Sequence, residues 1–180
     1  VCTHGTVDAC CARFGFPLYR ELHRIAAEED DSVRVWRSTH FGGHRFAATL
    51  IDFPEGRFWG FMTPDLGRQL IARGGDVAAL RGAYRGWAGH ASVPAQHLEG
   101  EILLREGWAW TTWPHQAEIL DASRPGAVSL RITAFPPGSD AVVYEGVVAE
   151  AGLLPVLHST DGEMEDEMQY EVREVRRLSG

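Results

Sequence analysis

The sequence predicts an α/β fold, because amphipathic helical segments alternate with short apolar strands through the first half of the chain. A helix is expected over 11–28, where apolar residues recur at steps of three and four: Cys11, Phe14, Leu18, Leu22 and Ile25. Strand-like runs follow over 33–39 and 46–53. The turn signal Pro54-Glu55-Gly56 then indicates a hairpin that is completed by 57–62.

A second helix follows this hairpin. Thr63 is expected to cap it, Pro64 to occupy its first position and Gly74-Gly75 to end it. A further short helix is expected over 76–84. The order is then strand remnant, helix, strand, hairpin and helix, which is the order of a thioredoxin-like fold whose first strand is nearly missing.

The second half is expected to form a smaller α+β region, with a junction near 89–94 that divides the chain into 1–90 and 91–180. A helix should run to about Glu106. Strands are expected over 128–132, over 142–148 and around 168–172, with an acidic loop over 161–167. Three tryptophans are expected in a core or interface: Trp108, Trp110 and Trp113.

Composition excludes several classes of function. The net charge is −8 and every basic residue is arginine, which argues against a nucleic-acid partner. No apolar run approaches the length of a membrane-spanning helix, and no signal peptide opens the sequence. The 3 cysteines all lie within the first eleven residues, an odd and clustered set that a disulfide framework would not use. We therefore expect a cytoplasmic protein with a ligand or redox cluster.

Two pairs of residues, one of cysteines and one of histidines, are the candidate metal ligands. Cys2 and Cys11 have eight residues between them, and His40 and His44 have three. In a parallel α/β arrangement both segments leave strands at the same edge of the sheet, where sites are usually built. Two thiolates and two imidazoles suit either zinc or a [2Fe–2S] cluster. The wide cysteine gap favours the larger cluster, and Gly42-Gly43 would let the backbone approach its sulfurs.

The runs Cys2-Thr3-His4-Gly5-Thr6-Val7-Asp8-Ala9-Cys10-Cys11 and His40-Phe41-Gly42-Gly43-His44-Arg45-Phe46-Ala47 resemble the sucrase/ferredoxin-like family. This resemblance implies a thioredoxin-like ferredoxin whose [2Fe–2S] cluster is held by Cys2, Cys11, His40 and His44. By analogy with all-cysteine ferredoxins, the cysteine pair would hold one iron and the histidine pair the other. Cys10 falls outside the spacing and is interpreted as a neighbour.

The family implies an electron carrier rather than a stand-alone enzyme, with an unidentified redox protein as donor or acceptor. Two other functions stay open at this point: a Cys2His2 zinc module and a metal-free thiol oxidoreductase. The second is disfavoured because no C-x-x-C motif is present and adjacent cysteines form strained disulfides. Three arginines flank the predicted site, with ordinary surface roles favoured over compensation of cluster charge or contact with an acidic partner: Arg13, Arg37 and Arg45.

Overall fold

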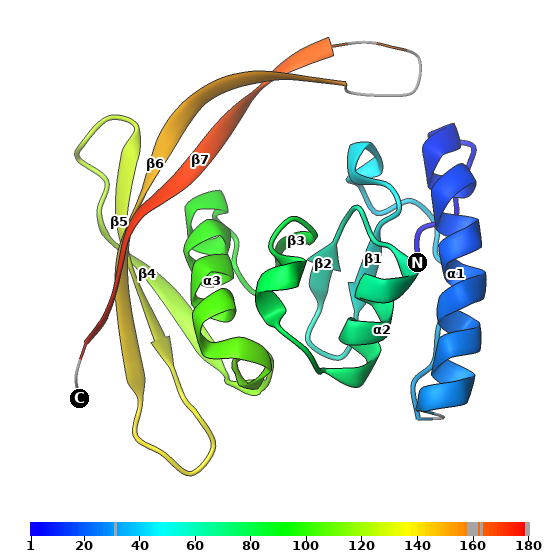
Figure 1. The fold of residues 1–180 in the computed structure, drawn as a ribbon. Helices are drawn as coiled ribbons and strands as arrows, with labels where there is room; N and C mark the ends of the chain where they lie inside the picture. Colours follow the sequence, from blue (N-terminus) through cyan, green and yellow to red (C-terminus); the bar gives the residue numbers. More distant parts are fainter. Residues whose placement is uncertain (31, 158–161, 163, 179–180) are drawn as a thin grey trace. The chain divides into compact units, whose positions relative to one another are not determined.

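The computed structural model describes residues 1–30, 32–157, 162 and 164–178, and within them it contains three α-helices and two β-sheets (Figure 1). The elements are α1 (Ala9–Glu29), β1 (Leu50–Asp52), β2 (Arg57–Trp59), α2 (Pro64–Ala72), β3 (Tyr84–Trp87), α3 (Val93–Glu106), β4 (His115–Asp121), β5 (Ala127–Ala134), β6 (Val142–Leu157) and β7 (Met164–Leu178). Short 3-10 helices cover His44–Phe46, Val77–Leu80 and Gly107–Thr112. The mixed α/β class is therefore confirmed.

The chain divides into two compact units. The first unit comprises Val1–Phe53, Arg57–Arg85 and Val156–Glu165, and the second comprises Pro54–Gly56, Gly86–Pro155 and Asp166–Gly180. The three-stranded sheet has the order β1-β2-β3, and the four-stranded sheet has the order β4-β5-β6-β7. All four predicted metal ligands lie in the first unit.

Helix α1 confirms the first predicted helix and begins two residues earlier than expected. Asp8 caps it, because its side chain accepts a hydrogen bond from the backbone N–H of Cys10 at 2.9 Å. Leu18, Leu22 and the other members of the predicted apolar stripe are buried, except Phe14, which is 49% exposed. Helix α2 packs against it through Gly67, where any Cβ would overlap the Leu22 side chain (Figure 1).

The segment 1–3 runs beside the chain around Ser38. Cys2 and Ser38 form a parallel bridge, and the N–H of Ser38 donates to the carbonyl of Val1 at 2.8 Å. On its other side the N–H of Cys2 donates to the carbonyl of Thr49 at 3.0 Å. The prediction of a strand over 33–39 was wrong except at Ser38, because the remaining residues of that run have no strand partner among the described residues.

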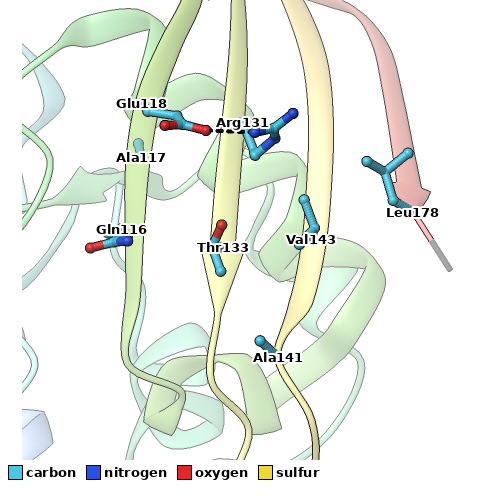
Figure 2. Close-up of a pocket in the computed structure, with 8 residues that line it drawn as sticks. All are labelled: Gln116, Ala117, Glu118, Arg131, Thr133, Ala141, Val143 and Leu178. Atoms are coloured by element: carbon cyan, nitrogen blue, oxygen red, sulfur yellow. Dashed lines mark hydrogen bonds and ion pairs between the residues drawn. The ribbon is translucent and has the colours of Figure 1, made fainter. Parts of the chain in front are cut away.

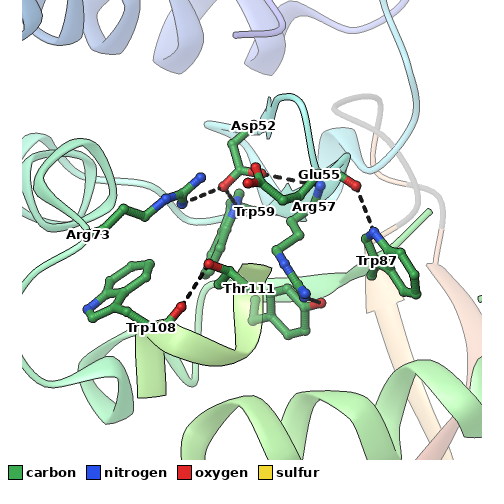
Figure 3. Close-up of polar contacts among 9 residues, drawn as sticks. Asp52, Glu55, Arg57, Trp59, Arg73, Trp87, Trp108 and Thr111 are labelled. Carbon is green, nitrogen blue, oxygen red and sulfur yellow. Dashed lines mark hydrogen bonds and ion pairs between the residues drawn. The ribbon is translucent and has the colours of Figure 1, made fainter. Parts of the chain in front are cut away.

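The hairpin β1–β2 is confirmed, with antiparallel pairing in which Asp52 lies opposite Arg57. Its first strand begins only at Leu50, so the predicted strand over 46–53 was too long, because the chain through Phe46 forms a 3-10 turn instead. Asp52 ties the hairpin to its surroundings: Arg73 donates to it at 2.8 Å and the Trp59 indole at 3.2 Å (Figure 3).

The cap of the second helix is also as predicted. The Thr63 hydroxyl accepts from the N–H of Leu66, and Pro64 stands in the first turn. The helix expected over 76–84 was only partly right, since a 3-10 helix covers Val77–Leu80 and Tyr84 already belongs to β3.

In the second unit, helix α3 confirms the predicted helix and lies along one face of the four-stranded sheet (Figure 1). Gly146 of β6 allows this approach, because a Cβ there would overlap the Leu98 side chain. Trp110 is fully buried, as expected for a core residue. The acidic loop was misplaced: Met164–Glu167 begin strand β7, and residues 161 and 163 lie outside the described residues.

A cavity of about 610 Å³ opens on strands β4–β6 of this sheet (Figure 2). The charged side chain at its centre is already paired, since Arg131 contacts Glu118 at 2.8 Å and Glu145 at 2.7 Å. We assign this cavity no binding role.

Among the helices of the described residues, none combines the length and the apolar character needed to cross a bilayer.

Candidate metal centre

Two cysteines and one histidine meet at the start of helix α1. The ligand atoms of Cys2, Cys11 and His40 all lie within 4.8 Å of one another. Within this group, Cys11 Sγ lies 3.8 Å from His40 Nδ1. Both cysteines are only 1% exposed, so their thiols are shielded from solvent. The structure therefore brings together three of the four predicted ligands, from segments almost thirty residues apart.

The fourth predicted ligand lies next to this group. The rings of His40 and His44 have their centroids 5.4 Å apart and are tilted by 39°. Between them, Gly42 and Gly43 adopt φ values of 95° and 70°, a region in which residues with a side chain are strained. The two glycines reverse the chain, and Gly43 starts the 3-10 turn that begins at His44. The sequence pattern H-x3-H thus places both rings on one short loop.

The cysteine thiols crowd one another. Burial raises the pKa of the Cys11 thiol, and the nearby Cys2 and Cys10 thiols raise it further by hydrogen bonding and by their negative charge when ionised. Thiolates packed in this way are unfavourable by themselves. A bound cation would instead favour the ionised thiolates, because metal ligation requires deprotonated sulfur and the metal supplies the compensating positive charge.

Cys10 has a different environment. Its thiol donates to the carbonyl of His44 at 3.0 Å, and its side chain is only half-buried. It lies outside the group of three donor residues, in keeping with its interpretation as a neighbour. Its contact links the first turn of α1 to the histidine loop.

Sequence reasoning missed one buried neighbour, Thr49. Its side chain is 4% exposed, and its backbone carbonyl holds the N–H of Cys2. Its methyl group also lies 3.8 Å from the position that a Cβ on Gly43 would take. Thr49 therefore lies next to both Cys2 and the histidine loop. Its place in an apolar run gave no signal of this role.

Known proteins resemble the part of the chain that contains the predicted ligands. Residues 1–86 match the sequence model of the sucrase/ferredoxin-like family. The match supports the family inferred from the two spaced pairs, and it ends close to the boundary of the first unit. No solved structure matches the chain.

One curated relative of the chain is the altered inheritance of mitochondria protein 32 of the yeast Meyerozyma guilliermondii. The two are 35% identical over 57 residues, which is 31% of this chain. The matched part is 20% of the relative, so this chain resembles about a fifth of that protein.

The arginines that flank the predicted site contact aromatic rings. Arg13 lies 5.4 Å from the Phe14 ring centroid, and Arg37 lies 6.0 Å from that of Phe16. Arg45 lies 4.7 Å from the Phe46 centroid. The same ring is approached by Arg85, a residue that sequence analysis did not single out.

Gly15 provides a test of how the site is assembled. A Cβ at this position of α1 would overlap the backbone carbonyl oxygen of Cys2, which a rotamer change cannot relieve. We expect Gly15→Ala to push the Cys2 strand away from the helix and to reduce metal content at least severalfold, measured by elemental analysis. Gly82→Ala is the matched control, because a Cβ there meets nothing within 4 Å. Equal metal content in both variants would contradict the close packing of Cys2 on α1.

Proposed function

We propose that the protein is a one-electron carrier whose [2Fe–2S] cluster is held by Cys2, Cys11, His40 and His44. The observation that supports this most directly is the convergence of three donor atoms within 4.8 Å from two separate segments. The adjacent His44 ring completes a set of two thiols and two imidazoles. This donor set is known to support such clusters.

The residues present fit this group chemically. Bound in the site, the cluster would take up and release a single electron. The buried thiolates would balance iron charge, and the neutral imidazoles would leave the reduced state less negatively charged than four thiolates do. Gly42 and Gly43 have no side chains to keep the backbone at a distance. Burial of both cysteines would limit access of water and oxidants.

The proposal extends to fold and partner. We place the first unit in the thioredoxin-like class, supported by α1 lying between two segments joined by a parallel bridge at Cys2 and Ser38. The partner would be a protein that donates or accepts electrons, with the cytoplasm as the proposed compartment.

A structural zinc site is the second candidate. Three donor atoms within 4.8 Å of one another suit a single tetrahedral ion, for which His44 or Cys10 would be the fourth ligand. This candidate predicts a colourless protein with no redox activity.

Anaerobic purification followed by metal, sulfide and absorption analysis separates these functions. The proposal requires a red-brown protein with iron and acid-labile sulfide in equal amounts. A colourless protein with one bound zinc ion would contradict the electron-carrier proposal and favour the structural zinc site. A colourless, metal-free protein with a titratable disulfide would instead favour the thiol oxidoreductase.

Replacing His44 with cysteine should keep the cluster and lower its reduction potential. An anionic thiolate stabilises the ferric state, and His-ligated clusters lie on the order of a few hundred millivolts above plant-type clusters. We expect a decrease on the order of 100 mV for one exchanged ligand, measured by protein-film voltammetry. His23→Cys, at an exposed position on α1, is the control. An unchanged or raised potential in His44→Cys would contradict ligation by His44.

A further inference from the structure

Two arginines and two phenylalanines form a compact cationic cluster beside the histidine loop, here called the arginine patch: Arg45, Phe46, Phe61 and Arg85. The Arg85 guanidinium lies 4.3 Å from the Phe46 ring centroid and 5.1 Å from that of Phe61. Arg45 lies 4.7 Å from the Phe46 centroid. Resting on the function proposed above, we propose that this patch is the docking surface for a redox partner with an acidic surface.

The patch is built onto the loop that carries the proposed ligands. Arg45 and Phe46 follow His44 directly within one 3-10 turn. The backbone N–H of Phe61 donates to the Phe46 carbonyl at 2.6 Å, and the two rings meet edge to face with centroids 5.5 Å apart. A Cβ at Gly60 would come within 2.6 Å of the Phe46 Cβ, so the glycine is needed for this approach. A partner bound here would lie beside the histidine side of the centre.

The two guanidinium groups repel each other. Burial lowers the pKa of Arg85, and the positive charge of Arg45 lowers it further. The hydrogen bonds of Arg85 go to two backbone carbonyls, those of Tyr84 at 3.0 Å and Gly82 at 2.6 Å. Neither contact offsets its charge. A carboxylate brought by a partner would relieve the repulsion and accept hydrogen bonds from a planar guanidinium.

The charge of the chain is unevenly distributed in a way that favours an acidic partner. Residues 1–86 contain 11 arginines and 10 acidic residues, whereas the rest of the chain contains 6 and 15. The net charge of −8 therefore arises in the second part. The total charge alone would suggest a basic partner, but it does not describe the part that carries the proposed centre. Several acidic side chains of the first part are paired away from the patch, as Glu21 and Glu28 are with Arg24. The part of the chain that carries the proposed centre therefore has a net charge of +1, and the rest has −9.

Phe61 gives the patch an apolar contact point. Its side chain is 51% exposed, and its backbone adopts a φ of 52°, an unfavourable conformation for a residue with a Cβ. Exposed aromatic residues together with arginine are the composition typical of interface cores. The electrostatic contacts would steer the partner, and Phe61 would be covered on binding.

The reaction at this surface would be simple. With a cluster held by Cys2, Cys11, His40 and His44, a reduced partner would supply one electron to the centre and would itself be oxidised by one electron. No bond is made or broken and no proton is transferred. The arginine patch acts only by holding the two proteins together.

The test uses the full chain and two protein probes of opposite charge. Photoreduced flavodoxin, an acidic carrier, serves as electron donor to the oxidised protein, and basic ferricytochrome c serves as acceptor from the reduced protein. The double variant Arg45→Gln/Arg85→Gln should react with flavodoxin about tenfold more slowly at low ionic strength, with a weaker dependence on salt. Its reaction with cytochrome c should be unchanged or faster.

Binding of oxidised flavodoxin, measured by calorimetry, gives a readout that needs no electron transfer. Its affinity should fall by a similar factor in the double variant and stay unchanged in Arg24→Gln, where the removed charge is paired on α1. Reduction potentials of all variants exclude a change in driving force, and circular dichroism excludes misfolding.

The outcomes distinguish this inference from the function on which it rests. A protein with its cluster but with flavodoxin affinity and rate unaffected by the double substitution would overturn the docking proposal alone. Binding of inorganic phosphate at the patch without binding of flavodoxin would make it a small-anion site and would also overturn it. Arginine-dependent flavodoxin binding by a protein without iron would support the surface and overturn the cluster.

Discussion

Replacing Cys11 with alanine is expected to abolish metal binding, whereas the same replacement at the adjacent Cys10 should leave it intact. The Cys11 thiol is buried in the group of three donors, 3.8 Å from His40 Nδ1. The Cys10 thiol instead contacts the His44 carbonyl. Loss of one of the two thiolates removes both a ligand and half of the anionic charge available to the metal.

The measurement is metal and sulfide content, with visible absorption, after anaerobic purification of both variants. We expect Cys11→Ala to be colourless with less than about a tenth of the metal of the unsubstituted protein, since one ligand of four is lost. Cys10→Ala should keep the spectrum, with a small shift because its hydrogen bond to the loop is gone. Bleaching of Cys10→Ala with a coloured Cys11→Ala would mean that the ligand assignment is wrong.

The parts of this site that sequence could predict depend on short-range signals. The cap at Asp8 and the apolar stripe through Leu22 are local features, and both determine where α1 begins and which face it buries. The cap at Thr63 is another such signal. The spacing of each ligand pair is local too, and it places His40 and His44 on one loop. The convergence of these pairs needed an assumption about topology, which the parallel bridge at Cys2 supports.

What sequence could not predict depends on pairing between distant segments. The run through Val33 and Val35 has the residues of a strand but finds a partner only at Ser38, because propensity is weaker than the availability of a neighbour. Strand β4 was not predicted, because its sequence shows no clear alternation of apolar and polar residues. It is a strand because it pairs with β5. Arg85 joins the arginine patch from forty residues away, and no spacing rule connects it to Arg45.

The buried carboxylate of Glu99 is predicted to be a main determinant of stability in the second unit. Glu99 lies on α3 and is fully buried, and the Trp110 indole N–H donates to its Oε1 at 2.7 Å. The same oxygen lies 3.8 Å from Nε2 of His115, whose side chain is also buried. Trp110 and His115 additionally face each other, with ring centroids 4.5 Å apart. The carboxylate therefore accepts a hydrogen bond from the indole and lies within ion-pair distance of the imidazole, inside an aromatic core.

Replacing Glu99 with alanine should lower the free energy of unfolding by about 3–5 kcal/mol, because it leaves a cavity and deprives the buried indole N–H of Trp110 of its acceptor. Glu99→Gln keeps an acceptor for the indole and should cost less, about 1–2 kcal/mol. Urea denaturation followed by tryptophan fluorescence measures both, and Glu150→Ala on the exposed face of β6 should change little. Because the chain has two units, the transition reported by metal content should shift less than the one reported by Trp110. Equal stability of Glu99→Ala and Glu150→Ala would show that the carboxylate does not hold this core together.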